Sequence, residues 1–232
     1  MMLRKWEDLP EFMKNDGVLE YYKILEKKKV SLVLKRVFDL VVGTVMLIIL
    51  AIPMGIIALM IKMDSKGPVF YRQERVTAYG KKFKIHKFRT MVNNADKIGA
   101  AVTVDGDNRI TKVGAKLREH RLDEFPQVFD VLSGDMSFVG TRPEVTKYVK
   151  KYTNEMMATL LLPAGITSEA SIRYKDEAEL LDAAEDVDRV YVEEVFPGKM
   201  KYNLQSIRKF GFFEEIATMF RTVFAVLGKE YQ

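Results

Sequence analysis

The feature that most constrains this chain is a run of 22 residues from Leu40 to Ile61, LVVGTVMLIILAIPMGIIALMI, in which Thr44 is the single polar side chain. A helix of that length is about 33 Å long, which is enough to cross the hydrocarbon core of a bilayer. Buried helices of soluble proteins seldom run so far without a charge, so the run predicts membrane insertion. It starts too late and is too long for a signal peptide.

Two details of this run favour a helix that enters the membrane and returns. Pro53 lies inside it, where proline removes a backbone hydrogen bond and bends a helix. Cations flank both sides, Lys35 and Arg36 before and Lys62 after, whereas a spanning helix favours one positive side. A helix that breaks at Ile52–Pro53 and turns back leaves both flanks on the cytoplasmic face. The alternative is a plain spanning helix with a proline kink.

The composition restricts the chemistry that the chain can carry out. It has no cysteine, which excludes disulfides and thiolate sites, and two histidines are too few for a three-histidine zinc site. Nine Lys and Arg stand against two acids between Lys62 and Arg89, whereas seven acids and no base lie between Asp176 and Asp188. The basic part predicts an anionic partner, which is a phosphate, a nucleic acid or an anionic membrane face.

The chain shows no internal repeat or low-complexity linker, which predicts one membrane-anchored domain of the α+β class. Residues 1–30 form an amphipathic extension that suits an interfacial or a surface helix. Its apolar residues at helical spacing are Trp6, Leu9, Phe12 and Met13. Residues 31–63 form the re-entrant membrane helix, in which we expect Asp39 to pair with one of the two preceding cations. Residues 64–232 form a mostly helical cytoplasmic domain with a small β element.

Two segments after the membrane run, PVFYRQERV and KKFKIHKFRTM, are typical of strands joined at residues 78–80. Their cations alternate with apolar residues, which predicts one cationic face and one buried apolar face. Further on, Pro126 and Gly134 suit the start and the end of one helix. Pro143 suits the start of another helix that carries Tyr148 and Tyr152.

The last third contains an acidic helix-like stretch to Asp188 and then an amphipathic helix. The apolar residues on one face of that helix are Phe213, Ile216, Phe220, Val223, Phe224 and Leu227. This face either packs on the domain or lies in the membrane interface, and the sequence leaves both open.

Asp123 and Glu124 stand side by side in EHRLDEFPQVFDVL, directly before the helix that Pro126 is expected to begin. Unpaired N–H groups and the dipole favour anions there, so both acids can simply cap the helix. Neighbouring side chains point in different directions, so one acid can instead approach a substrate while the other does something else. Two anions this close raise each other's pKa unless an arginine or a metal compensates. With no cysteine and few histidines, the metal that fits is Mg²⁺.

Several segments, in this order, resemble the bacterial sugar transferases, the monotopic polyprenyl-phosphate phosphoglycosyl transferases that start glycan assembly. The segments are KRVFDLVVGTVMLIILAIPMGIIALMIKMDSKGPVFYRQERV, KKFKIHKFRTM, RLDEFPQVFDVLSGDMSFVGTRPE and LPAGITS. The resemblance runs from about Ser31 to Leu227. It implies an anchor on the cytoplasmic face of the bacterial inner membrane through a helix–break–helix. The break is often Ser-Pro in the family and is Ile52–Pro53 here.

The resemblance also implies roles for the acid pair. Asp123 is implied to attack the β-phosphate of a UDP-sugar, release UMP and carry the phosphosugar as an acyl phosphate. Undecaprenyl phosphate then attacks that intermediate. Glu124 is implied as the Mg²⁺ partner, with Asp123 beside it.

Five residues are expected to bind the substrates: Arg89, Arg118, Arg121, Arg142 and Pro143. Arg89 matches the arginine of the family's KFRTM segment, a phosphate contact. Arg142 and Pro143 match a Pro-Arg-Pro motif whose first proline is Thr141 here. LPAGITSEASIRYK replaces the usual KPGITG run, so no sugar-reading residue carries over.

Two other functions fit parts of the pattern. A membrane-tethered module that binds nucleic acid or anionic lipid explains the basic strands but not the adjacent acids. A metal-dependent hydrolase of nucleotide sugars would yield free sugar phosphate without using lipid. The expected partners are a UDP-sugar, undecaprenyl phosphate and membrane lipids, with no nucleic acid. A homodimer, the sugar and the glycan pathway stay open.

Overall fold

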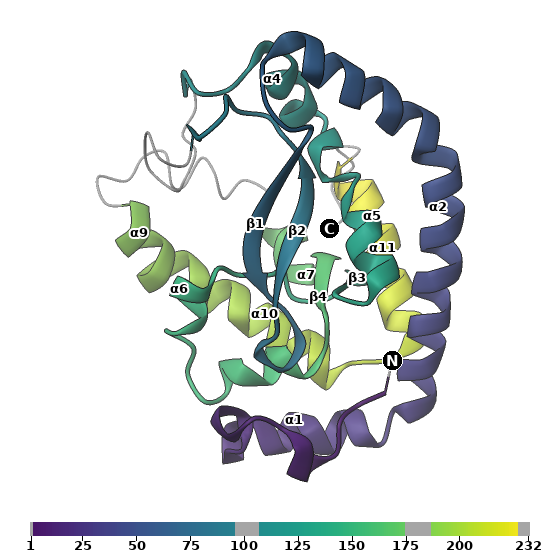
Figure 1. Ribbon diagram of the computed structural model, residues 1–232. Helices are drawn as coiled ribbons and strands as arrows, with labels where there is room; N and C mark the ends of the chain where they lie inside the picture. Colours follow the sequence, from purple (N-terminus) through teal and green to yellow (C-terminus); the bar gives the residue numbers. More distant parts are fainter. Residues whose placement is uncertain (1, 96–106, 175–186, 227–232) are drawn as a thin grey trace.

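One long curved helix and a two-stranded hairpin frame the molecule (Figure 1). Helix α2 runs over Lys29–Asp64, and the hairpin consists of β1 (Phe70–Val76) and β2 (Lys82–Phe88). The computed structural model describes residues 2–95, 107–174 and 187–226. These residues are mostly helical with two small sheets, in agreement with the predicted α+β class.

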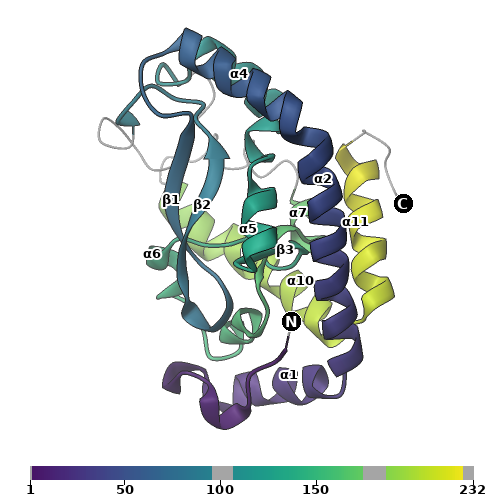
Figure 2. The ribbon, with the colours of Figure 1, turned by 45° about the vertical axis from the view of Figure 1, so that its right-hand side comes forward.

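The other main elements lie between the hairpin and α2, beside them and at their ends (Figures 1 and 2). In chain order they are α1 (Asp16–Glu26), α4 (Lys112–Glu119), α5 (Gln127–Ser133), β3 (Met136–Val139), α6 (Thr146–Val149), β4 (Ala164–Thr167), α7 (Glu169–Arg173), α9 (Val187–Val190), α10 (Phe196–Arg208) and α11 (Phe212–Val226). A π-helical turn, Tyr191–Val195, joins α9 to α10.

Helix α2 continues through Pro53, so the predicted break at Ile52–Pro53 is not seen. Proline opens the side of a helix on which it lies, and the helix bends away from it. Pro53 is exposed, while Met54 and Ile57 beside it are buried against the domain. The helix therefore curves around the domain instead of ending, because packing on the inner side holds the turns on both sides of the proline (Figure 1).

Both halves of α2 contact the same domain. The first half packs against α5, β3 and α11, with Leu32 and Gly43 among its buried residues. The second half buries Ile61 in a cluster with Phe88 of β2 and Leu117 of α4. Elements of this domain therefore accompany the helix along its length.

The opposite face of α2 is apolar and uncovered. Its exposed large side chains are Val30, Val33, Leu34, Val37, Leu40, Val41, Val45, Ile48, Ile49, Ile52, Ile56, Leu59, Met60 and Met63. Only 17% of its most apolar 18-residue window is buried, and among the described helices it is the one long and apolar enough to cross a membrane. An apolar surface of this size requires a cover, which supports association with a membrane.

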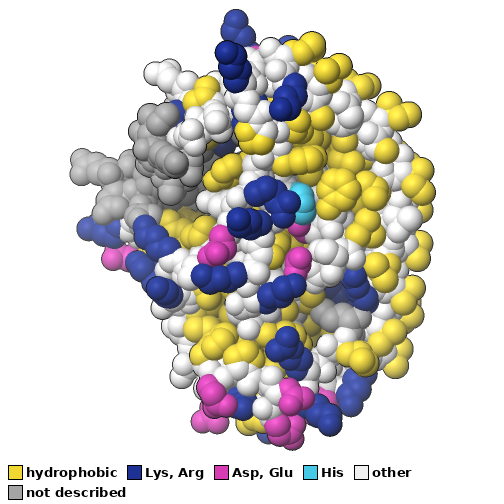
Figure 3. Space-filling view, in the orientation of Figure 1, with side chains coloured by type: hydrophobic (Ala, Val, Ile, Leu, Met, Phe, Trp, Pro, Cys, Tyr) yellow, Lys and Arg dark blue, Asp and Glu magenta, His cyan; other side chains and the backbone are white. Residues whose placement is uncertain are grey.

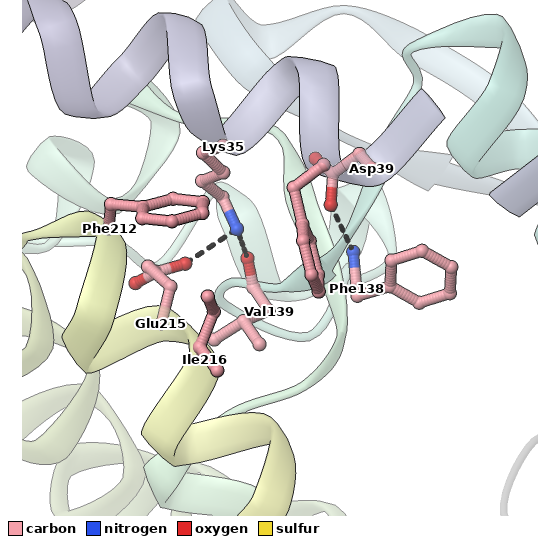
Figure 4. Close-up of a pocket in the computed structure, with 8 residues that line it drawn as sticks. Lys35, Asp39, Phe138, Val139, Phe212, Glu215 and Ile216 are labelled. Atoms are coloured by element: carbon pink, nitrogen blue, oxygen red, sulfur yellow. Dashed lines mark hydrogen bonds and ion pairs between the residues drawn. The ribbon is translucent and has the colours of Figure 1, made fainter. Parts of the chain in front are cut away.

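The charged residues at the start of α2 are paired differently from the prediction. Asp39 accepts a hydrogen bond from the backbone N–H of Phe138, at 3.3 Å, and not from a neighbouring cation. Lys35 forms an ion pair with Glu215 of α11, 2.5 Å from Nζ to Oε2, and donates to Val139 O at 2.8 Å (Figure 4). The physical reason is that α11 and β3 cover this turn, so buried partners from distant segments replace the local pair.

The first thirty residues are part of the core. Residues expected to form one helix instead form two 3-10 turns, Trp6–Asp8 and Glu11–Met13, followed by α1. Leu9 and Met13 are buried in a cluster with residues of α1, α10 and the 3-10 helix Met156–Leu161. This extension therefore packs against the domain.

Two sheets of two strands each position the central loops. Strands β1 and β2 are antiparallel, and their connection uses left-handed backbone at Tyr79 (φ 58°) and Gly80 (φ 73°), as the predicted connection at residues 78–80 requires. Strands β3 and β4 are parallel. A Cβ added at Gly165 of β4 would lie 2.1 Å from Gly140 N, so the two backbones approach as closely as glycine allows.

Helix α6 does not begin at Pro143. It starts at Thr146, because the chain after Pro143 is held extended by a hydrogen bond from Val76 N to Glu144 O, at 3.0 Å. It ends at Val149, before Tyr152.

Helix α11 lies beside α2 in both ribbon views and both packs on the domain and exposes apolar side chains (Figures 1 and 2). Phe212 makes an edge contact with Phe38 of α2, while Phe213, Phe220 and Val223 are exposed. Packing on the domain and lying in the membrane interface, the two alternatives left open by the sequence, are therefore compatible for this helix. Leu227 and residues 175–186, which include most of the acidic stretch, lie outside the described residues.

Candidate active site

The acid pair precedes helix α5, as the sequence predicted. Asp123 and Glu124 form a 3-10 turn with Leu122, and Arg121 before them has a left-handed backbone (φ 54°). Pro126 directly precedes the first residue of α5, and Gly134 ends it with φ 87°. The turn packs against β2, and both carboxylates lie near Lys87 of that strand.

Glu124 is held by two cations. Its Oε1 accepts hydrogen bonds from Lys87 Nζ at 2.6 Å and from Arg142 Nη2 at 2.5 Å. Burial raises the pKa of Glu124, but Arg142 and Lys87 more than offset burial, so the pKa lies well below its usual range. Glu124 is therefore a fixed anion in this site.

Asp123 has a different environment although it is the next residue. Its Oδ2 lies 4.0 Å from Lys87 Nζ, beyond hydrogen-bond distance. Burial raises the pKa of Asp123; Lys87 partly opposes this and the charge of Glu124 adds to it. Two adjacent carboxylates with pKa values moved in opposite directions are typical of acids with different roles.

Lys87 is a site residue that the sequence analysis did not single out. It was counted among the basic residues of the strands, where alternation predicted a cationic outer face. Lys87 instead shares a face with the buried Phe83 and Ile85, and burial lowers its pKa. That strand position was the available signal, because a lysine on the apolar face of a strand requires a buried anion.

Arg142, Pro143 and Arg118 lie at or near the pair. Arg142 bonds Glu124 directly, and Pro143 is buried behind it. Arg118 lowers the pKa of Asp123 through its charge and donates from Nε to Thr90 Oγ1 at 3.0 Å. Arg121 adjoins the pair in sequence and its side chain is exposed.

The structure places Arg89 elsewhere. Its guanidinium donates to Lys66 O at 2.6 Å and to Ser65 O at 2.8 Å, which are carbonyls just beyond the end of α2. Arg89 is only 5% exposed, and this contact ties the end of β2 to the end of α2. A phosphate contact by Arg89 stays a prediction, and the geometry gives this residue a structural role.

Arg75 adds a further cation that the sequence analysis did not assign. Burial lowers its pKa, and the charge of Glu144 partly restores it. The charge of Arg142 also lowers the pKa of Arg75. The site is thus one anionic pair within a group of cations, a field that suits a diphosphate.

The side chains present can hold Mg²⁺ only together with a substrate. Among the residues that the structure describes, no three His, Cys, Asp or Glu side chains cluster as a complete metal site. Mg²⁺ usually binds proteins through one or two carboxylates and takes its other oxygens from water and phosphates. Glu124 and Asp123 fit that pattern, because only one oxygen of Glu124 bonds the two cations.

The sequence matches the family model described as bacterial sugar transferase over residues 30–229, which is most of the chain. The chain belongs to the bacterial sugar transferase family. As a member of this family it is a transferase.

Named relatives of this bacterial sugar transferase act on undecaprenyl phosphate. A putative undecaprenyl-phosphate N-acetylgalactosaminyl 1-phosphate transferase of Bacillus subtilis is 39% identical over 160 residues, 68% of this chain and 87% of that protein. The UDP-glucose:undecaprenyl-phosphate glucose-1-phosphate transferase of Escherichia coli is 35% identical over 200 residues, 84% of this chain and 40% of that protein. The UDP-N-acetylgalactosamine-undecaprenyl-phosphate N-acetylgalactosaminephosphotransferase of Aeromonas hydrophila is 32% identical over 197 residues, 84% of this chain and 44% of that protein. The chain thus spans less than half the length of the last two.

Proposed function

We propose that this chain transfers a sugar 1-phosphate from a UDP-sugar to undecaprenyl phosphate at the cytoplasmic face of a bacterial inner membrane. The names of its relatives supply the substrate classes. The observation that carries the proposal is the contrast between the two carboxylates, with Glu124 bonded by two cations and Asp123 outside hydrogen-bond distance of the nearer one.

Asp123 is the nucleophile of the first step. A carboxylate that receives little hydrogen bonding keeps its electron pairs available, and carboxylates are established nucleophiles in phosphoryl transfer. Its oxygen bonds to the phosphorus that bears the sugar while the bond from that phosphorus to the UMP oxygen breaks. UMP leaves with the bonding electrons, and Asp123 holds the sugar phosphate as an acyl phosphate.

Lys87 and Arg142 serve both steps as fixed cations. They hold Glu124 in position and oppose the charge that develops on the phosphoryl oxygens and on UMP. Glu124, with Asp123, would hold Mg²⁺ brought by the diphosphate, and the ion would supply further neutralisation of the phosphates.

The second step regenerates Asp123. A phosphate oxygen of undecaprenyl phosphate bonds to the phosphorus of the acyl phosphate, and the bond from that phosphorus to the Asp123 oxygen breaks. The product is an undecaprenyl diphosphosugar and a free carboxylate. Because the acceptor is dissolved in lipid and the donor in water, the site must be held at a membrane surface.

The packing of α2 supports a helix with both ends on one side of the membrane. Elements of one domain accompany the helix along its length, and its other face is apolar. A helix upright across the bilayer would carry those polar elements into the hydrocarbon region, at a high cost in free energy. We therefore propose that α2 enters the cytoplasmic leaflet shallowly, with its curvature taking the place of a sharp break.

The test incubates the detergent-solubilised protein with UDP-sugars, Mg²⁺ and undecaprenyl phosphate, and measures UMP and lipid-linked sugar. In the absence of acceptor, a donor labelled in the sugar should leave its label on the protein. Asp123→Asn should abolish both the adduct and the turnover, while Asp8→Asn, a surface control, should retain them. Full turnover by Asp123→Asn would refute the assignment of Asp123 as the nucleophile. Full activity in excess chelator would show that the reaction does not need Mg²⁺. A panel of labelled donors would identify the sugar.

A further inference from the structure

A His–Asp contact joins the hairpin to α5, separate from the acid pair. His86 Nδ1 is 2.7 Å from Asp130 Oδ1, and the backbone N–H of His86 donates to Asp130 Oδ2 at 2.8 Å. Because a carboxylate accepts at Nδ1, that nitrogen carries the hydrogen and the ring is fixed in one orientation. The Asp130 side chain is 2% exposed and the His86 side chain 24%, so the carboxylate is buried and the ring reaches the surface.

The other ring nitrogen of His86 is turned away from Asp130. Among the residues that the structure describes, no hydrogen-bond partner is placed on Nε2. A buried carboxylate that holds one nitrogen of a histidine is the usual way in which proteins aim the second nitrogen at a ligand. Burial raises the pKa of Asp130, and its hydrogen bonds to His86 oppose that rise.

Arg72 lies on the same face of the hairpin as His86. The two residues are direct partners across β1 and β2, so their side chains point to the same side of the sheet. The guanidinium donates from Nε and Nη2 to Lys84 O, at 3.2 and 2.9 Å, which fixes its plane and leaves Nη1 for another acceptor. Its charge also lowers the pKa of Asp130, which places it near the His–Asp contact.

Apolar side chains adjoin this polar group on the side of α2. His86 makes ring contacts with Phe70 and with Phe129, and Phe129 belongs to the cluster that includes Met54 and Ile57 of the membrane helix. In the space-filling view, Lys and Arg side chains gather over the hairpin, and a histidine lies between them and an apolar strip toward α2 (Figure 3). A ligand here meets donors at one end and the membrane helix at the other.

We propose that His86 and Arg72, with Asp130 as a positioning residue, hold the phosphate of undecaprenyl phosphate, whose chain lies along the apolar strip beside α2. This inference rests on the proposed function and adds to it the residues that receive the acceptor. Asp130 lies seven residues after Asp123 in a nearly continuous helical stretch, so the two sites are about 10 Å apart. This subsite is near the reaction centre but outside bonding distance of it, so the acceptor phosphate must advance toward Asp123 for the second step.

A phosphate monoester matches these donors in either protonation state. A neutral ring accepts a hydrogen bond from a P–OH group, and a protonated ring donates one to the dianion, so the total charge of the complex is the same. Arg72 contributes the planar donor group that suits phosphate. A nucleotide sugar lacks a monoester phosphate and a lipid chain, which is why the acceptor is favoured over the donor.

The experiment separates the two steps in the full-length protein. His86→Gln and Arg72→Gln are compared with wild type and with Lys82→Gln, which removes one charge from the same hairpin at a residue paired with Glu74. We measure adduct formation from the donor without acceptor, and then the KM for undecaprenyl phosphate. His86→Gln and Arg72→Gln should each form the adduct at a rate within about twofold of wild type. Each should raise the acceptor KM about tenfold, which is the loss of affinity expected for one charge-assisted hydrogen bond. Lys82→Gln should change neither.

Native mass spectrometry of acceptor binding supplies a readout that needs no turnover. The probes are undecaprenyl phosphate, the neutral alcohol undecaprenol and inorganic phosphate. Both variants should bind less undecaprenyl phosphate and the same amount of undecaprenol, and inorganic phosphate should compete only weakly. Asp130→Asn should share the defect with the adduct step retained.

The outcomes distinguish this inference from the proposed function. If wild type forms no lipid-linked product, the proposed function fails, whereas the binding measurement still decides the subsite. Wild-type acceptor binding and KM in His86→Gln and Arg72→Gln would overturn the inference. An equal loss of adduct formation in both variants would overturn it as well, because that result assigns the residues to the donor.

Discussion

Lys87→Met removes one of the two cations on Glu124 and leaves Arg142 in place. The lost contact is a 2.6 Å charge-assisted hydrogen bond between side chains only 22% and 15% exposed. Such a bond contributes about 1.5–3 kcal/mol to stability. Burial lowers the pKa of Lys87, so removing the ammonium also relieves a desolvation cost, and we expect the lower end of that range. For a chain of this size, about 1.5 kcal/mol corresponds to a Tm lower by about 3–6 °C.

The Tm difference between wild type and Lys87→Met should depend on pH because the pKa of Glu124 is lowered in the folded protein. A carboxyl group with a lowered folded-state pKa adds stability above its ordinary pKa, and that stability is lost as the pH falls toward the folded value. In Lys87→Met the folded pKa rises back toward the ordinary one. The Tm difference should therefore be full at neutral pH and shrink below about pH 4.

The effect on catalysis should be larger than the effect on stability. Loss of a fixed cation that faces developing phosphate charge costs about 10²–10³-fold in turnover. The assay is UMP release from the UDP-sugar, with Lys82→Met as the control for charge and Lys87→Arg as the variant that should recover part of the rate. Release by Lys87→Met within twofold of wild type would refute the role given to this lysine.

Three further changes test the fold and the membrane arrangement. Gly165→Ala would place a Cβ 2.1 Å from the backbone of Gly140, so it should prevent folding or lower the Tm measured by thermal denaturation. The control Gly55→Ala has no atom within 4 Å of the added Cβ and should leave the Tm unchanged or raise it. Lys35→Met leaves Glu215 buried without its cation and should destabilise by about 3–5 kcal/mol, with partial recovery when Glu215→Met is added; no recovery would argue against the pair. Because the chain has no cysteine, single cysteines introduced near the two termini can be labelled cleanly, and we expect both on the same side of the membrane; opposite sides would exclude a shallow α2.

The hairpin shows how far periodicity predicts a site. Alternation correctly predicted that Phe83 and Ile85 are buried while Lys82 and Lys84 are exposed. It failed at Lys87, because β2 has α5 and the acid turn packed beside it there, and those partners lie about forty residues further along the chain. A pattern within one strand carries no information on which distant segment covers it.

A local rule was also overridden in α2. Pro53 predicts a break from its own chemistry, yet side chains on the inner face hold the helix together across it. The contacts of Arg89 with carbonyls near the end of a helix that precedes it by more than twenty residues were not predicted, and its contact with a phosphate stays a prediction. The acid pair, in contrast, could be singled out from the sequence because two adjacent carboxylates before a proline-started helix are a local pattern. The cations that hold Glu124 come from distant segments.

The contact of Arg89 with the end of α2 has a mechanical consequence. Arg89 follows Lys87 by two residues and lies directly after β2, so the membrane helix and the cation that reaches Glu124 are joined by one short connection. The depth at which α2 settles in lipid then sets the height of the reaction centre above the bilayer. A change in that depth would move Lys87 with it, so turnover should depend on the lipid composition of the bilayer.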